Sequence, residues 1–346
     1  MQEAPGQPVR RPVPRWRRRL AGGMLACVVA MVIAYGLWSP GIDVDDGRHD
    51  RGRNGLWLQH GWLANDAWLV RNQRDPARFR DPAKLRELAQ LLRTNHITDI
   101  YPHLCPCSAS GSIAPWDATQ TERLLDELPV ARVMPWVGGV LGDSAKPDSG
   151  TWRAGFVASV SKLLREHPRL AGVHVNIEPM PSGHQGFLVL LAELRATMPP
   201  GKILSVAAYP PPTLWQPAPE VHWTEDYFRA VAQQADQIAV MMYDTSIRLA
   251  KPYENLMSQW TREVLLWAGD KPVLLGVPAY DDAESGYHHP DVENLRHALR
   301  GVHAGLIQGP LPANYQGVAI YCEWEMDDAE WRHWRKWFVN ENLTPP

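Results

Sequence analysis

Eight short apolar runs recur along the chain after residue 54, and segments with helical spacing alternate with them. Such runs are typical of buried parallel strands, and the intervening segments fit the helices of right-handed crossovers. Eight units in about 290 residues match the (β/α)₈ TIM barrel, so this α/β fold is predicted. A doubly wound open sheet is the alternative, but no G-x-G-x-x-G follows the first run. The runs are Gly55–Leu63, Ile97–Leu104, Ala131–Gly138, Gly172–Pro179, Ile203–Pro210, Gln237–Thr245, Pro272–Tyr280 and Gly317–Trp324.

The first forty residues differ in composition from the rest of the chain. An arginine-rich stretch at 1–19 precedes an uncharged run at 20–38, which as a helix would span about 28 Å, close to the hydrocarbon thickness of a bilayer. No small-residue cleavage site follows it, so we expect an uncleaved transmembrane signal anchor. Residues 1–19 would be a cytoplasmic tail, 39–53 a linker, and 54–346 a barrel domain on the periplasmic or extracellular side of the cytoplasmic membrane.

Composition excludes several classes of function. The formal net charge of -3 argues against nucleic acid as a partner. Four cysteines are too few for a disulfide scaffold, and any pairing among Cys105, Cys107 and Cys322 is left open. The 16 tryptophans are in excess over 5 phenylalanines, which fits either sugar-binding surfaces or core packing. We expect no cofactor.

The strongest functional signal lies in the fourth apolar run. With a period of two residues, His174, Asn176 and Glu178 share one face of a strand, and the apolar residues between them share the other. The polar face would point into the barrel, where burying an unmatched carboxyl costs about 1–3 kcal/mol. This pattern indicates a catalytic role for Glu178, with a structural hydrogen-bond network as the alternative. It does not indicate a metal site, because asparagine is a poor zinc ligand.

Other candidates are read from the strand ends, since barrels place their chemistry at the carboxyl ends of the strands. Tyr243 and Asp244 end the sixth run and are expected to position a substrate beside Glu178. The remaining candidates are aromatic or polar residues expected to bind substrate. These are His174, Trp62, Trp136, Tyr209, Tyr280, Tyr321, Glu323 and Trp324.

Four stretches together resemble glycoside hydrolase family 18, the chitinase and endo-N-acetylglucosaminidase family. Ala171–Glu178 is similar to the family's D-G-x-D-x-D-x-E, with Glu178 at the position of the catalytic acid. The other three are M-x-Y-D at Met241–Asp244, G-[VI]-P-x-Y at Gly276–Tyr280, and the region from Gly317 to Asp328. The chain departs from the family by having His174 and Asn176 in place of aspartates and Tyr321 in place of tryptophan.

Together with the predicted N-terminal anchor, the resemblance implies a membrane-anchored glycoside hydrolase or transglycosylase that acts on a cell-envelope or exported polysaccharide. The family mechanism is retaining and substrate-assisted, since the 2-acetamido oxygen of the sugar attacks the anomeric carbon. Asn176 would orient this acetamide and Tyr243 would hydrogen-bond to it. Two alternatives remain open. One is a two-carboxylate glycosidase that pairs Glu178 with Glu323 or Asp244; the other is a carbohydrate-binding barrel without turnover.

Overall fold

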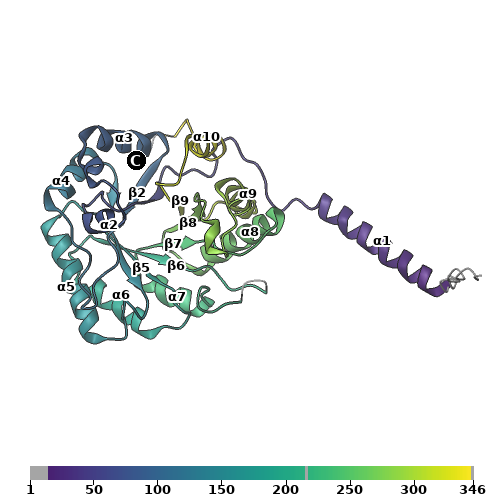
Figure 1. Ribbon diagram of the computed structural model, residues 1–346, viewed down its shortest axis with the longest axis horizontal. Coiled ribbons are helices and arrows are strands. Elements are labelled where there is room, and N and C mark those ends of the chain that lie inside the picture. Colours follow the sequence, from purple (N-terminus) through teal and green to yellow (C-terminus); the bar gives the residue numbers. More distant parts are fainter. Residues whose placement is uncertain (1–14, 215–216, 344–346) are drawn as a thin grey trace, which may run out of the picture. The chain divides into compact units, whose positions relative to one another are not determined.

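The computed structural model describes residues 15–214 and 217–343, and residues 1–14 of the predicted cytoplasmic tail lie outside this description. The chain divides into two compact units, residues 1–39 and 40–346. The second unit is a curled sheet of parallel strands with helices along its outside (Figure 1). The prediction of an α/β fold of the TIM-barrel type is confirmed.

All the described strands pair in parallel, in the order β3-β2-β1-β9-β8-β7-β6-β5-β4. They coincide with the eight predicted runs, except that the third run forms two short strands. The strands are β1 (Asn54–Leu58), β2 (Ile97–Pro102), β3 (Arg132–Val133), β4 (Trp136–Val140), β5 (Gly172–Glu178), β6 (Ile203–Ala208), β7 (Gln237–Met241), β8 (Val273–Pro278) and β9 (Tyr315–Tyr321).

Helices alternate with these strands, and polar side chains fix where several of them begin. Asp117, Ser149 and Asn294 each accept a backbone N–H bond from the first turn of the following helix, which satisfies a group that the helix itself leaves unpaired. The helices of this unit are α2 (Asp66–Arg71), α3 (Pro82–Thr94), α4 (Ala118–Glu127), α5 (Gly150–Glu166), α6 (Gln185–Thr197), α7 (Glu225–Gln234), α8 (Ala250–Trp267), α9 (Leu295–Leu306) and α10 (Asp328–Trp337), with short 3₁₀ turns η1 (Pro76–Arg80) and η2 (Ala283–Ser285).

The divided third strand joins the two ends of the sheet. Pro135 lies between β3 and β4 and has no backbone N–H to give to a ladder. Toward β2, the N–H of Met134 donates to the carbonyl oxygen of Ile100. Toward β5, the N–H of His174 donates to the carbonyl oxygen of Pro135. The segment therefore bridges β2 and β5, which brings the strands into a ring.

The core has two layers, as expected for a barrel. Val173, Val175 and Ile177 pack between the sheet and the helices, which is the face that the alternation in β5 predicts. A smaller cluster fills the inside of the sheet and includes Trp57 and Tyr101. The polar residues of β5 therefore lie on the inner face.

The stretch expected to be a linker packs against the barrel from residue 40 onward. His49 and Asp50 are buried; Nδ1 of His49 lies 2.8 Å from Nδ1 of His303 in α9. One carboxylate oxygen of Asp50 lies 2.6 Å from Nδ1 of His96 and accepts the N–H of Asn340 at 3.0 Å. Residues 40–53 therefore belong to the folded unit and tie its first residues to its last.

The N-terminal unit contains one described helix, α1 (Arg15–Leu37). It begins inside the arginine block, whereas the predicted membrane-spanning segment begins at Leu20. Within the described residues, no helix meets the length and apolarity that crossing a membrane requires. The predicted transmembrane helix is therefore not supported.

Candidate functional site

A pocket of about 620 Å³ lies at the carboxyl ends of β5, β6 and β7. This volume is typical of sites that hold small molecules, which run to about 300–1,000 Å³. Glu178, Tyr209, Tyr243 and Asp244 are among its lining residues, so four of the predicted site residues share one cavity. Its remaining walls come from Val140, Pro179, Pro210, Ala218, Val221, His222, Met241, Ser246 and Tyr287.

Glu178 ends β5 and turns its exposed surface to this pocket. Protein atoms surround the carboxyl on its other sides, and this burial raises its pKa above the ordinary value. A hydrogen bond from Asn176 opposes the increase, and the negative charge of Asp244 adds to it. Tyr209 donates its hydroxyl to Oε2 at 3.4 Å. The net effect is a carboxyl that holds its proton to a higher pH, as a general acid must.

Asn176 lies under Glu178 on the inner face of β5 and is buried. Its Nδ2 donates to Oε1 of Glu178 at 2.5 Å, while its Oδ1 is buried without a hydrogen-bond partner. The backbone of Asn176 is approached closely by Gly138, where a Cβ would lie 1.8 Å from the carbonyl oxygen of Asn176. Glycine is therefore required at 138 for β4 to lie against this part of β5.

His174 lies below these two residues and does not line the pocket. Its Nδ1 lies 2.9 Å from the hydroxyl of Ser205, and its Nε2 accepts the indole N–H of Trp57 at 3.2 Å. Its ring stacks on Tyr101 with centroids 4.1 Å apart. Burial lowers the pKa of His174 to about 3, so the ring is neutral and supports the site through hydrogen bonds.

Tyr321 at the end of β9 is the centre of an aromatic cluster. Its ring stacks on Tyr243 with a centroid distance of 5.4 Å and meets Tyr280 edge-on at 5.3 Å. Trp136 and Trp324 contact it edge-on at 6.2 and 5.7 Å. The structure therefore brings these predicted substrate-binding residues together beside the pocket.

Two other candidates lie away from the pocket lining. Trp62 is buried and packs edge-on against Phe79 at 5.1 Å. Glu323 accepts hydrogen bonds from the side chain of Gln59 at 3.2 Å and from its backbone at 3.5 Å. Burial raises the pKa of Glu323, against the opposing bonds from Gln59.

Two functional residues were missed by sequence reasoning. His288 lies in the loop after β8, in a stretch that reads as solvated, yet its side chain is 0% exposed and its Nδ1 lies 3.2 Å from Oδ1 of Asp244. The same Oδ1 accepts the hydroxyl of Tyr280. Glu293 is also fully buried and accepts the N–H of Thr245 at 2.8 Å. Neither lies on a periodic element; the one signal was the proximity of His288 to Tyr280 in the sequence.

Within residues 15–214 and 217–343, neither the cysteines nor the side chains that can bind metals form a second candidate site. Cys105, Cys107 and Cys322 are free thiols and are buried, and burial raises the pKa of each. No group of three or more His, Cys, Asp or Glu side chains in these ranges is arranged to hold a metal ion.

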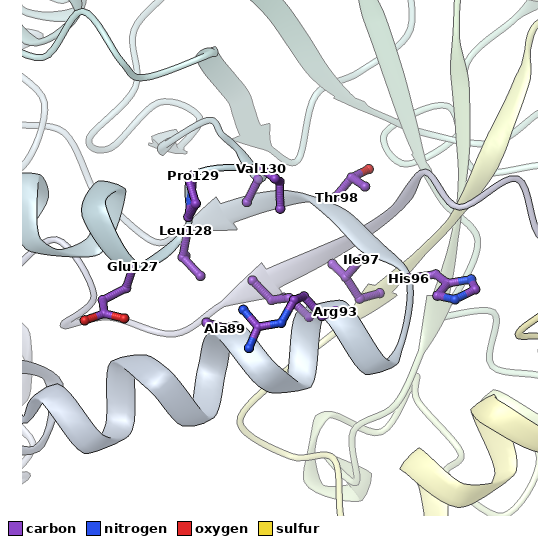
Figure 2. A pocket seen from close by; sticks show the side chains of 11 residues that line it. Ala89, Arg93, His96, Ile97, Thr98, Glu127, Leu128, Pro129 and Val130 are labelled. Atoms are coloured by element: carbon purple, nitrogen blue, oxygen red, sulfur yellow. The ribbon is translucent and has the colours of Figure 1, made fainter. Parts of the chain in front are cut away.

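A separate cavity of about 410 Å³ lies at the amino-terminal end of β2. Figure 2 shows Ala89 and Arg93 of α3 on one side of it, and Leu128 and Val130 of the loop after α4 on the other. Its lining holds no carboxylate paired with another reactive group. Residues at the amino-terminal face of a barrel serve stability, so we place the chemistry at the opposite end.

The sequence matches no family model and no curated protein. Solved structures do match the fold. The spore cortex-lytic enzyme SleL of Bacillus cereus is 11% identical over 83% of this chain and 74% of that one, with a TM-score of 0.53. A GH18 chitinase from Pseudoalteromonas aurantia is 15% identical over 81% and 97%, with a TM-score of 0.53. A chitinase from Chromobacterium violaceum is 20% identical over 81% and 98%, with a TM-score of 0.50. The chain therefore has a barrel similar to theirs.

Proposed function

We propose that this chain is a glycoside hydrolase or transglycosylase that acts on a polysaccharide containing 2-acetamido sugars, from the cell envelope or exported from the cell. Glu178 is the general acid that protonates the leaving oxygen. The observation that carries the proposal is the pair at the end of β5: a carboxyl with a raised pKa facing a pocket, hydrogen-bonded to Asn176. The fold similarity to GH18 chitinases and SleL supports the same activity.

Asn176 supplies the second part of the mechanism. Its buried Oδ1 has no partner in the protein, and leaving such an acceptor unpaired costs about 1–3 kcal/mol. Asn176 lies behind Glu178 and is not itself among the residues that line the pocket. The N–H of a 2-acetamido group that enters beside Glu178 would satisfy this oxygen and would hold the acetamide oxygen for attack on the anomeric carbon. The intermediate is then an oxazolinium ion, and no enzyme nucleophile is needed. Asp244 in the same pocket stabilises the positive charge that develops.

The two-carboxylate alternatives have less support. The Oε2 of Glu323 accepts hydrogen bonds from both the side chain and the backbone of Gln59, which hold this carboxylate in place. Asp244 lines the pocket, but its Oδ1 is held by Tyr280 and His288, which stabilises the anion and makes it a weak nucleophile. Substrate assistance uses neither group as a nucleophile.

The test is turnover of aryl glycosides and oligosaccharides that carry a 2-acetamido, 2-amino or 2-hydroxyl group. Only the acetamido series should be cleaved, and the initial product should keep the anomeric configuration of the substrate. Replacing the acetyl by mono-, di- and trifluoroacetyl should slow the reaction stepwise, because fluorine withdraws electrons from the attacking oxygen. Equal cleavage of 2-hydroxyl sugars would replace substrate assistance by a two-carboxylate mechanism. Binding without cleavage of any sugar would make the barrel a lectin-like module.

Where the chain resides in the cell stays a prediction, drawn from the arginine block and the apolar run that follows it.

A further inference from the structure

A cluster of buried charged groups lies behind the wall of the pocket. His288 and Glu293 are both fully buried. Asp244 is the member that reaches the pocket, and its side chain is 37% exposed. Its backbone has a φ of +62°, an uncommon conformation for a residue with a side chain, which here turns the chain after β7 toward the pocket.

Each ring nitrogen of His288 faces an oxygen atom of the protein. Nε2 lies 3.0 Å from the carbonyl oxygen of Tyr280, which only accepts, so Nε2 carries a proton. Nδ1 lies 3.2 Å from Oδ1 of Asp244, which already accepts the hydroxyl proton of Tyr280. Nδ1 faces this oxygen at the distance of an ion pair, without the geometry of a hydrogen bond. The nearby carboxylate favours an imidazolium at this position, and the imidazole ring also stacks on Tyr280 with centroids 4.0 Å apart.

Glu293 provides a second carboxyl next to this pair. Its Oε2 accepts the N–H of Thr245 at 2.8 Å, while its Oε1 is buried without a hydrogen-bond partner. Burial raises the pKa of Glu293 to about 7, against the bond from Thr245 and the charge of His288. Burial alone lowers the pKa of His288, but Asp244 and Glu293 outweigh it and the net shift is upward.

Two tyrosines contact this cluster from behind the pocket, while Glu178 and the tyrosines Tyr209, Tyr243, Tyr287 and Tyr321 face Asp244 from the pocket side. Tyr253 of α8 donates its hydroxyl to the carbonyl of Met242 at 3.4 Å, and Tyr280 donates to Asp244. Burial raises the pKa of both hydroxyls, so they stay protonated in the neutral range. The groups around Asp244 whose pKa moves toward or above the neutral range are therefore His288, Glu293 and, across the pocket, Glu178.

We propose that His288 is a positioning residue of the pocket, which holds the Asp244 carboxylate in place from behind, with Glu293 as its buried counter-charge. The inference rests on the proposed function, because Asp244 matters to catalysis through Glu178 and the developing positive charge. His288 itself touches neither the pocket nor a substrate within it. It acts through the ion pair between its ring and the Asp244 carboxylate, at 3.2 Å.

The first experiment needs no turnover. Imidazole ¹⁵N shifts are followed against pH in the full chain, and the His288 signals are identified by their loss in His288→Gln. We expect His288 to titrate above the ordinary 6.5 of a free imidazole. Asp244→Asn and Glu293→Gln should each move that titration to lower pH, and His289→Gln should not. Titration at or below 6.5, or titration unmoved by either variant, would overturn the proposal.

The second experiment measures kcat and KM for His288→Gln, Asp244→Asn and the double variant. His288→Gln should lower kcat about tenfold, as expected for the loss of the ion pair that holds Asp244 in place, with little change in KM. In the Asp244→Asn background the same change should have little further effect, because its target is gone. Additive losses would show that His288 has a separate structural role and would overturn the proposal.

The two experiments separate this inference from the proposed function. If no glycan is turned over while His288 titrates as expected, Glu178 is not a general acid, but the cluster of charged groups around His288 remains. Turnover without the upward shift of the His288 titration would remove only the present inference. Circular dichroism of each variant shows whether it has folded.

Discussion

The amide nitrogen of Asn176 donates to Oε1 of Glu178 across 2.5 Å, from two residues below on the same face of β5. The bond holds one oxygen of the acid in place and lowers its pKa, so it works against the increase that burial causes. Asn176 therefore affects both the position of the acid and its affinity for a proton. The predictions that follow test this arrangement and the pocket around it.

Glu178→Gln removes the proton donor and keeps the shape of the side chain. We expect turnover of 2-acetamido glycosides to fall by about 10²–10⁴-fold, the usual contribution of a general acid, with oligosaccharide binding retained. Steady-state kinetics and calorimetric titration check this. Glu220→Gln is the matched control, since Glu220 is an exposed glutamate outside the pocket lining. Full activity in Glu178→Gln, together with its loss in Glu323→Gln, would show that the acid is misassigned.

Asn176→Asp puts a second carboxyl beside the acid. A like charge in contact raises the pKa of Glu178 further, so the basic limb of the kcat/KM profile should move to higher pH. Activity on 2-acetamido sugars should be retained or increased, and sugars without the group should gain nothing. Asn176→Ala should lower turnover on the acetamido series, because the acetamide is no longer oriented. An unchanged rate in Asn176→Ala would contradict the orienting role.

Two variants should move the pH profile in opposite directions. Asp244→Asn removes a negative charge that raises the pKa of Glu178, so the basic limb should move to lower pH. Tyr209→Phe removes a hydrogen bond that lowers that pKa, so the limb should move to higher pH. Because kcat/KM reports the free enzyme, its pH dependence is the measurement. Shifts of the same sign in both variants would mean that another group sets the limb.

The folded unit should lose stability in mild acid. Burial lowers the pKa of His49 and of His303 to about 4, whereas an unfolded histidine takes up its proton near 6.5. Between these values the unfolded state binds more protons, so stability falls as pH falls from 6.5 toward 4. Each histidine contributes about 2 kcal/mol between pH 7 and pH 5. Urea unfolding at both pH values checks this, and His49→Asn should reduce the difference.

Much of the barrel follows from the sequence because strands and crossover helices leave local, periodic patterns. The alternation in β5 correctly separates Val173, Val175 and Ile177 from the polar face, and parallel strand ends meet at one edge. Tyr209, Tyr243 and Asp244 are therefore found beside Glu178 although they are distant in the sequence.

What was missed depends on contacts that no local pattern encodes. His288 is buried because a loop folds over Asp244, and His49 meets His303 across 254 residues. Trp62 shows the reverse case: a residue at a strand end packs into the core when a neighbouring turn, here η1 with Phe79, covers it. Pro135 divides the third strand, which an apolar run alone does not reveal.

The contact between residues 40–53 and the end of the barrel unit makes the topology of this unit nearly circular. A Cβ at Gly47 would lie 2.4 Å from Cα of Asn340, and Asp50 accepts the N–H of the same residue. Neither end can fray alone, since releasing Asp50 also frees Asn340 and leaves His96 without its partner. Separation of β1 from β9 is therefore expected to release the first and the last residues of this unit together. A permuted chain, joined here and opened in an exposed loop, would keep every strand beside its present neighbours.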